Sequence, residues 1–206
     1  MQIHAVIDGS LVNGPGRRTV IWFQGCDING IGKSRCPGCW NPQTHARFGG
    51  FVATSDELIS RIGKAHRELG TEGVTLSGGE PIHQIDSVLV LLTALRSRLT
   101  NFTAGLFTGY TRSELEAGRF TTYSISDPLL RRESWRRLEQ LLDFAVFGRF
   151  HQRQPASEPL VSSRNQQLCP LSDRYQRHQF APQTVEITID PEGLTQITGF
   201  PILGSL

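Results

Sequence analysis

The chain has 206 residues, of which 38% are hydrophobic and 19% are charged, so it can bury a core and is not a disordered polymer. Its formal net charge of +2 is too small to indicate a nucleic-acid partner. No apolar stretch approaches the roughly 18 residues of a membrane helix, and the N-terminus lacks the pattern of a secretory signal. We therefore expect a soluble, cytoplasmic protein that binds neither nucleic acid nor a membrane.

The first element that the sequence predicts is a strand over residues 19–23, which are β-branched or aromatic. It leads into residues 26–50, which contain many Gly, Pro and Asn residues without periodicity and are expected to form a long loop. Loops of this length are usually functional or disordered. The loop holds Cys26, Cys36 and Cys39, with the spacing Cys-x9-Cys-x2-Cys.

Helices and strands then alternate along the chain. The pattern begins with a helix between the capping box at 54–57 and Gly70. The later expected elements are a strand over 73–77, a helix over 85–99, a strand over 102–107, a short helix over 111–118, a helix over 133–142, a strand over 143–147, and two strands around a turn at 190–193, the first over 184–189. Alternation favours a parallel sheet with crossover helices. About four such units are too few for an eight-unit barrel, so we expect an α/β fold that is an open, partial parallel β/α barrel.

The C-terminal quarter has a different character. Residues 151–182 show no clear periodicity and contain clusters of Pro, Ser and Gln. Residues 119–180 hold ten Arg against six Asp and Glu, which is typical of a solvated, irregular segment and also suits a docking surface for an acidic partner. We expect a single domain over 1–206, with its core over about 18–150 and an irregular extension over about 151–206.

The three clustered cysteines favour metal binding over disulfides, because a cytosolic chain of this size needs no covalent staple. Zinc with a fourth ligand such as His45 is one possibility. An iron–sulfur cluster is the other, and three thiolates would leave one iron free to bind a substrate. The spacing alone leaves both open. Cys169 is remote in sequence and is more typical of a small buried side chain than of a fourth ligand.

A glycine-rich turn follows the strand over 73–77, with the sequence Ser77-Gly-Gly-Glu-Pro81. Glycines let the backbone approach a ligand closely, and strand-end amides and carbonyls can bind a zwitterion. A Gly-Gly pair alone is usually an ordinary turn. Here it gains meaning because the carboxyl ends of parallel strands meet at one edge of a sheet, so this turn and the cysteine loop open toward the same end.

Several short motifs follow one another in a fixed order over residues 13–201. They are Asn13-Gly-Pro-Gly16, Phe23-Gln-Gly-Cys26, Cys36-Pro-Gly-Cys-Trp-Asn-Pro-Gln43, Leu76-Ser-Gly-Gly-Glu-Pro81, Thr108-Gly-Tyr110, Gly148-Arg-Phe150, Ser163-Arg-Asn-Gln166 and Ile197-Thr-Gly-Phe-Pro201. This ordered set resembles the radical S-adenosylmethionine enzymes, and among them the small glycyl-radical activating proteins of the anaerobic ribonucleotide reductase type. The resemblance favours an iron–sulfur cluster over zinc.

The resemblance implies that Cys26, Cys36 and Cys39 bind three irons of a 4Fe-4S cluster and that the fourth iron chelates S-adenosylmethionine. Reductive cleavage would then give a 5′-deoxyadenosyl radical that abstracts a hydrogen atom from a glycine of a partner protein. The other candidate cofactor-binding residues are Gly38, Trp40, Ser77, Gly78, Gly79, Glu80 and Thr108. The implied partners are a glycyl-radical protein and a reductant such as flavodoxin or ferredoxin. A monomer or a weak homodimer is expected.

The cysteine spacing departs from the family pattern, because nine residues separate Cys26 from Cys36 where three are usual. Lengthening a loop from about 4 to about 10 residues costs only ~0.8 kcal/mol in closure entropy, so a cluster can tolerate it. The departure leaves the substrate open. One alternative is a radical S-adenosylmethionine enzyme that acts on a small molecule or peptide, like the deazaguanine synthases. The other is a non-enzymatic zinc-binding module.

Overall fold

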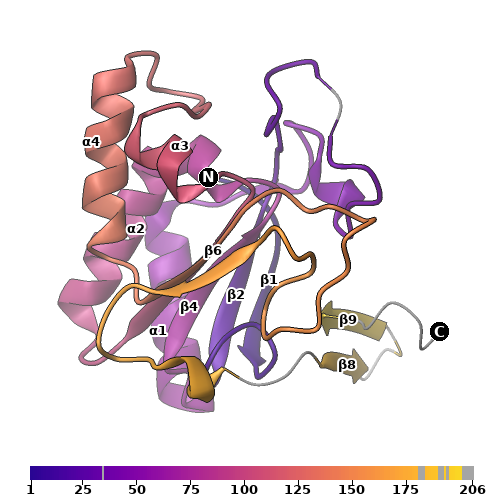
Figure 1. The fold of residues 1–206 in the computed structure, drawn as a ribbon. Helices are drawn as coiled ribbons and strands as arrows, with labels where there is room; N and C mark the ends of the chain where they lie inside the picture. Colours follow the sequence, from indigo (N-terminus) through magenta and orange to yellow (C-terminus); the bar gives the residue numbers. More distant parts are fainter. Residues whose placement is uncertain (34, 181–183, 190–192, 194, 201–206) are drawn as a thin grey trace.

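Seven strands form one sheet, with the four predicted strands β2, β4, β5 and β6 at its centre (Figure 1). The structure is a computed structural model that describes residues 1–33, 35–180, 184–189, 193 and 195–200. In spatial order the strands are β3-β1-β2-β4-β5-β6-β7. Their bounds are β1 (Gln2–Ser10), β2 (Arg18–Phe23), β3 (Phe51–Val52), β4 (Gly73–Gly78), β5 (Thr103–Thr108), β6 (Phe144–Phe147) and β7 (Gln167–Pro170).

The four middle strands, β2, β4, β5 and β6, are parallel to one another, as the alternating pattern predicted. The edge strands are antiparallel: β1 pairs with β2, β3 with β1, and β7 with β6. The sequence analysis did not identify these edge strands. β1 has side chains of intermediate exposure along most of its length and β3 has two residues, so neither shows the apolar pattern of a buried strand.

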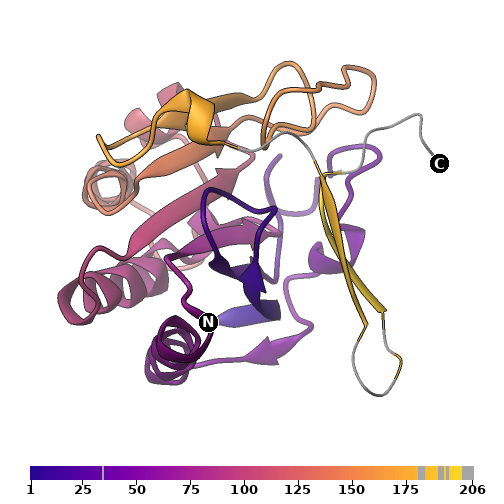
Figure 2. The ribbon, with the colours of Figure 1, turned by 90° about the horizontal axis from the view of Figure 1, so that it is seen from below.

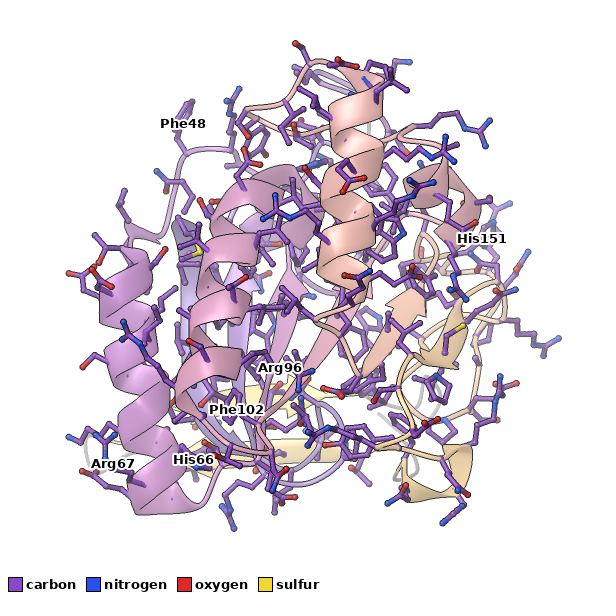
Figure 3. The ribbon with its side chains drawn as sticks, turned by 90° about the vertical axis from the view of Figure 1, so that its left-hand side faces the viewer. Phe48, His66, Arg67, Arg96, Phe102 and His151 are labelled. Carbon is purple, nitrogen blue, oxygen red and sulfur yellow. The ribbon has the colours of Figure 1, made fainter. Side chains whose placement is uncertain are left out.

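Three long helices lie side by side across one face of the sheet (Figure 3). The helices are α1 (Ser55–Leu69), α2 (Ile85–Arg98), the short α3 (Arg112–Glu116) and α4 (Pro128–Glu139), and single 3-10 turns occur as η1 (Pro42–Thr44), η2 (Pro81–Gln84) and η3 (Arg177–Gln179). The predicted capping boxes at the start of α1 and α3 are both confirmed. None of the helices in the described part of the chain has the length and apolarity to cross a bilayer.

α4 begins five residues earlier than predicted. The Asp127 side chain accepts a hydrogen bond from Leu129 N–H at 2.8 Å, and Pro128 occupies the first turn, where its missing N–H costs nothing. Leu129 and Leu130 are exposed, so the first turn carries no apolar stripe from which its helical period could be read. The prediction followed the buried Trp135 and placed the start of the helix too late.

The C-terminal segment covers the other face of the sheet. Phe144 and Val146 of β6 form a second apolar cluster there with Leu160, Phe180 and Phe200. The irregularity expected for 151–182 is wrong at β7 and η3, which are four and three residues long and too short to show a period. Beyond them, β8 (Val185–Ile189) and β9 (Thr195–Gly199) pair as a separate antiparallel hairpin beside the main sheet (Figure 2). Most of the turn predicted at 190–193, and Pro201 of the last motif, lie outside the described residues.

Candidate functional site

A cavity of about 410 Å³ opens at the carboxyl ends of the parallel strands and continues along the sheet face away from the helices. The predicted site residues on its wall are Cys26, Cys36, Cys39, Trp40, Ser77, Gly78, Gly79, Glu80 and Thr108. The loops after β2 and β4 and the last residues of β4 and β5 supply them, so the strand-end geometry brings together residues up to 82 positions apart in sequence. Gly38 is the one candidate that does not line this cavity in the described structure.

The three cysteines are free thiols at this end of the sheet, with Cys26 buried and Cys36 and Cys39 half-buried. Each sulfur accepts a hydrogen bond from a backbone N–H group. The donors are Ile28 for Cys26, Phe150 for Cys36 and Asn41 for Cys39, the last at 3.4 Å. Backbone N–H groups stabilise thiolates, and hydrogen bonds to cysteine sulfurs are one of the factors that set the potential of an iron–sulfur cluster. These donors leave no sequence signal, because every residue carries the same amide.

Burial raises the pKa of all three thiols. For Cys26 the loss of solvation, reinforced by the nearby Glu80 carboxylate, raises the pKa to about 12. The pKa of Cys36 is raised by burial and then by Cys39, and that of Cys39 by burial. Thiolates packed this way need a cation to compensate them. The donor set therefore fits a metal centre better than it fits three independent reactive thiols.

Within the described chain, no three His, Cys, Asp or Glu side chains converge closely enough to hold a single metal ion. An iron–sulfur cluster does not require such convergence, since each thiolate binds a different iron. His45, the candidate fourth ligand for zinc, is not among the residues that line the cavity in the described structure.

The Gly-Gly turn fastens the end of β4 to the start of the cysteine loop. Gly79 N–H donates to Phe23 O and Glu80 N–H donates to Gly25 O, both at 2.9 Å. A Cβ on Gly79 would lie 2.3 Å from the carbonyl oxygen of Gly25, so only glycine permits this approach. Because these two amides are already bonded, what the turn can offer a ligand is carbonyl oxygen, which suits an ammonium group.

Glu80 connects the ends of β4 and β5. Its carboxylate is 1% exposed and accepts hydrogen bonds from Thr108 Oγ1 (2.9 Å), Gly109 N–H (2.8 Å) and Ile82 N–H (3.1 Å). Burial raises the pKa of Glu80 to about 7, although these hydrogen bonds lower it. The contacts hold the turn in place, and the carboxyl group also forms part of the cavity wall.

His83, to which no sequence motif pointed, anchors the cysteine loop. Its ring is fully buried, Nε2 accepts a hydrogen bond from Asp27 N–H at 2.8 Å, and Nδ1 donates to Thr121 O at 2.7 Å. Burial lowers the pKa of His83 to about 4, so the ring is neutral and can accept from an amide. Asp27, the residue directly after Cys26, is thereby fixed to the turn that follows β4.

The loop after β6 is attached to the same region. Arg149 forms an ion pair with Glu114 (2.9 Å) and donates to Asn29 Oδ1 (3.1 Å) and Ile28 O (3.3 Å). Gln166 accepts from the amides of 162 and 163 and donates to Gly148 O at 3.1 Å. The Gly148-Arg-Phe150 and Ser163-Arg-Asn-Gln166 motifs therefore brace one side of the cavity.

Aromatic contacts complete that side. The Trp40 ring lies 5.5 Å from the Phe150 ring and remains on the cavity wall. Gly38 has a φ of +67°, and a Cβ there would lie 2.4 Å from the Gln152 side chain. Gly38 therefore allows the cysteine loop to pack closely against the loop that carries Gln152. Tyr110 is buried, and its hydroxyl accepts from Thr121 N–H at 2.9 Å.

The far end of the cavity is closed by the first and last motifs. Asn13 Nδ2 donates to Ser10 Oγ and to Thr198 Oγ1, both at 2.9 Å, and the Phe200 ring lies 5.7 Å from the Phe107 ring. The residues from 196 to 200 line the cavity, so β9 and the residue directly after it form one of its walls. The Asn13-Gly-Pro-Gly16 turn thus holds the last motif in place.

The sequence matches the model of a family described as a 4Fe-4S single cluster domain over residues 12–169. It is 38% identical over 93 residues to the pyruvate formate-lyase-activating enzyme of Clostridium pasteurianum, which covers 44% of this chain and 37% of that enzyme. It is also similar to anaerobic ribonucleoside-triphosphate reductase-activating proteins. The Escherichia coli K12 protein is 27% identical over 135 residues (63% of this chain, 82% of the relative), and the Vibrio cholerae protein 28% over 159 residues (75% and 87%). The chain thus spans little more than a third of the Clostridium enzyme and most of the other two.

Proposed function

The chain belongs to the 4Fe-4S single cluster domain family, and we propose that it is a radical S-adenosylmethionine enzyme that activates a glycyl-radical partner protein. One observation carries the proposal: three free cysteines and the Gly-Gly-Glu turn line a single cavity at the strand ends. The names of the relatives, which are activators of pyruvate formate-lyase and of anaerobic ribonucleoside-triphosphate reductase, support the same function.

Cys26, Cys36 and Cys39 would hold a 4Fe-4S cluster and leave one iron for the amino and carboxylate groups of S-adenosylmethionine. When bound, the two cofactors supply a one-electron cleavage of the sulfonium and, from it, removal of a hydrogen atom from a glycine of the partner. The chain's own residues bind and orient the reactants and exclude water. The amides on the three sulfurs keep the ligands fixed and favour their deprotonated form.

The turn after β4 would receive the methionine end of the cofactor. Carbonyl oxygens of Ser77, Gly78 and Gly79 suit its ammonium group, and the buried Glu80 carboxylate, held by Thr108, adds negative charge nearby. Trp40 would contact the adenine, and Gly38 would allow the close packing of the loop that carries it.

The finer description of the fold follows from this function. We propose one radical S-adenosylmethionine domain over 1–206, with an open parallel β/α barrel as its core over about 18–150 and an extension over about 151–206. The proposed partners are a glycyl-radical protein and a one-electron donor such as flavodoxin or ferredoxin. The enzyme would act as a monomer or weak homodimer.

The test begins with anaerobic reconstitution. The protein should take up about four irons, show broad visible absorption and, once reduced, convert S-adenosylmethionine to 5′-deoxyadenosine and methionine. Cys36→Ala should abolish this cleavage. Cys169→Ala is the matched control, since Cys169 lies on β7 and does not line the cavity in the described structure, and it should cleave at the wild-type rate. Stoichiometric zinc without iron–sulfur absorption would instead indicate the zinc-binding module.

A second step identifies the substrate. Incubation with a glycyl-radical protein should yield a glycyl doublet in electron paramagnetic resonance. The Cys-x9-Cys spacing departs from the activator pattern and is the observation behind the alternative, an enzyme that acts on a small molecule or peptide. Cleavage of S-adenosylmethionine without a glycyl signal from several candidate proteins would support that alternative.

A further inference from the structure

The nine residues between Cys26 and Cys36 are closed at their base by an ion pair. Asp27 directly follows Cys26, Arg35 directly precedes Cys36, and Arg35 Nη2 lies 2.8 Å from Asp27 Oδ1. The side chains are 6% (Asp27) and 24% (Arg35) exposed, so the pair is much better shielded from water than a typical surface salt bridge.

Asp27 is held from the body of the protein as well. Its N–H donates to His83 Nε2 at 2.8 Å, its carbonyl accepts from Gly30 N–H at 2.8 Å, and Tyr123 OH donates to its second carboxylate oxygen at 3.5 Å. The pair therefore joins Arg35 to an aspartate whose position is fixed by the turn after β4. If Asp27 were instead mobile, its ion pair with Arg35 would not fix the position of Arg35.

Residues 29–33, within the span between the pair, turn outward. Gly30 N–H bonds Asp27 O and Lys33 N–H bonds Gly30 O at 3.1 Å, which folds this stretch into consecutive turns. Ile31 is 71% exposed and Lys33 is exposed. The extra length of the loop therefore projects from the surface, and the ends that carry the cysteines stay together.

We propose that Asp27 and Arg35 are positioning residues that hold Cys26 and Cys36 at the separation that one cluster requires despite the long spacing. The inference rests on the proposed function, because it concerns two of the proposed cluster ligands. In the usual pattern, three intervening residues keep the first two cysteines close to each other. Here a charged hydrogen bond to the fixed Asp27 keeps Cys26 and Cys36 close instead. Without it, the closure entropy of the long loop would favour arrangements in which Cys36 is displaced.

Cluster retention tests the proposal on the full chain. Asp27→Asn and Arg35→Gln should each speed anaerobic iron loss to a chelator about tenfold, equivalent to about 1.4 kcal/mol. The double variant should lose iron no faster than Arg35→Gln alone, since both substitutions remove the Asp27–Arg35 pair and only Arg35→Gln also removes the hydrogen bond from Arg35 Nη1 to Lys33 O. Arg61→Gln is the matched control: it breaks the Arg61–Asp8 pair, also 2.8 Å long but away from the cysteines, and should change the rate less than twofold.

A shortened loop separates loop closure from a general charge effect. Deleting residues 29–34 leaves Asp27, Ile28 and Arg35 between the two cysteines, a three-residue spacing. In that background Arg35→Gln should alter iron loss less than twofold. An equal acceleration in both backgrounds would overturn the proposal, because the pair would then act through charge alone.

Amide hydrogen exchange on the cluster-free full-length protein gives a second measurement if the shortened chain does not fold. Arg35→Gln should speed exchange from residue 27 to 33, and unchanged exchange there would refute a closing role. If wild type takes up four irons and none of the pair variants loses iron faster, this proposal is wrong and the proposed function is unaffected. Wild type that takes up no cluster would remove the proposed function and this inference together.

Discussion

At the end of β4, two buried titratable residues have pKa values shifted in opposite directions. Burial raises the pKa of Glu80 to about 7 from an ordinary 4.5, and burial lowers that of His83 to about 4 from 6.5. Both side chains are fully bonded within the chain, Glu80 to Thr108 and Gly109 and His83 to the amide of Asp27. Their effects on stability therefore oppose each other over nearly the same pH range.

Glu80→Gln should reveal the cost of the buried carboxylate. The folded-state pKa lies above the unfolded one, so the stability linked to this group is fully present below pH 4.5 and is lost as pH rises through 7. Relative to Glu80→Gln, wild type should lose on the order of 3 kcal/mol of unfolding free energy between these limits. Urea denaturation of the reduced, cluster-free proteins measures the difference. A difference that does not vary with pH would mean that the carboxylate is solvated.

His83→Gln should show the opposite trend. Here the folded-state pKa lies below the unfolded one, so the stability linked to the neutral ring is present above pH 6.5 and is lost as pH falls through 4. Wild type should lose on the order of 3 kcal/mol relative to the variant on acidification. His4→Gln serves as control for the substitution itself, because His4 is a partly buried histidine that contacts Gln24. A curve for His83→Gln that runs parallel to that of wild type would contradict the buried, neutral ring.

At the scale of elements, the β8–β9 hairpin depends on a few contacts with the body. Two-stranded hairpins are marginally stable alone. This one is held by the Asn13–Thr198 hydrogen bond and by Phe200, which is 8% exposed and packs with Phe107 in the second apolar cluster. Val185, Ile187, Ile189 and Ile197 are exposed, so the hairpin contributes little apolar burial of its own.

Phe200→Ala should detach the hairpin without unfolding the domain. Amide exchange in β8 and β9 should become at least about tenfold faster, because removing a buried aromatic ring costs about 3 kcal/mol. The amides of α1 and α2 should keep their wild-type rates. Phe48→Ala, at a ring that is 77% exposed, is the control and should change neither region. Equal acceleration in the helices would show that the hairpin is integral to the core.

The sequence predicted the elements whose own residues carry a signal. The capping boxes at 54 and 111 and the apolar stripes of α1 and α2 identified those helices, and β2, β4, β5 and β6 were found from runs of buried side chains. The edge strands were missed because a strand can pair with the edge of a sheet through its backbone N–H and C=O groups alone. Such pairing does not require an apolar pattern in the sequence. α4 was placed late because its start depends on Asp127 and Pro128.

Over the whole molecule, the candidate site likewise divides into residues that carry a sequence signal and residues that carry none. Cysteine spacing and glycine motifs located nine residues of the cavity wall, all but Gly38 of the candidates, since strand ends meet at one edge. The supporting groups could not be found in this way. The amides on the sulfurs are common to all residues except proline, and the contacts of His83 with Asp27 and of Arg149 with Ile28 join residues 56 and 121 positions apart. Such contacts follow from the packed fold and not from local sequence.

Charge is also distributed unevenly over the molecule. Residues 26–50 and 148–169, which flank the cysteine end of the cavity, hold six Lys and Arg against two Asp and Glu, or +4. The rest of the chain therefore carries −2 of the total +2. A field of this kind attracts an acidic protein toward the cavity and accelerates encounter at low ionic strength. An electron donor of the flavodoxin or ferredoxin type would be steered to this end.

Lys33→Glu and Arg153→Glu, both at exposed positions near the cavity, should therefore slow reduction of the cluster by an acidic flavodoxin several-fold at low salt. The difference should vanish near 0.5 M salt, where exposed charges are screened. Reduction by photoreduced deazaflavin, a small molecule, should stay unchanged. Arg132→Glu makes the same charge change on α4, across the sheet from the cavity, and should have little effect. If it slows reduction equally, net charge alone steers the donor and the asymmetry of the molecule has no part in it.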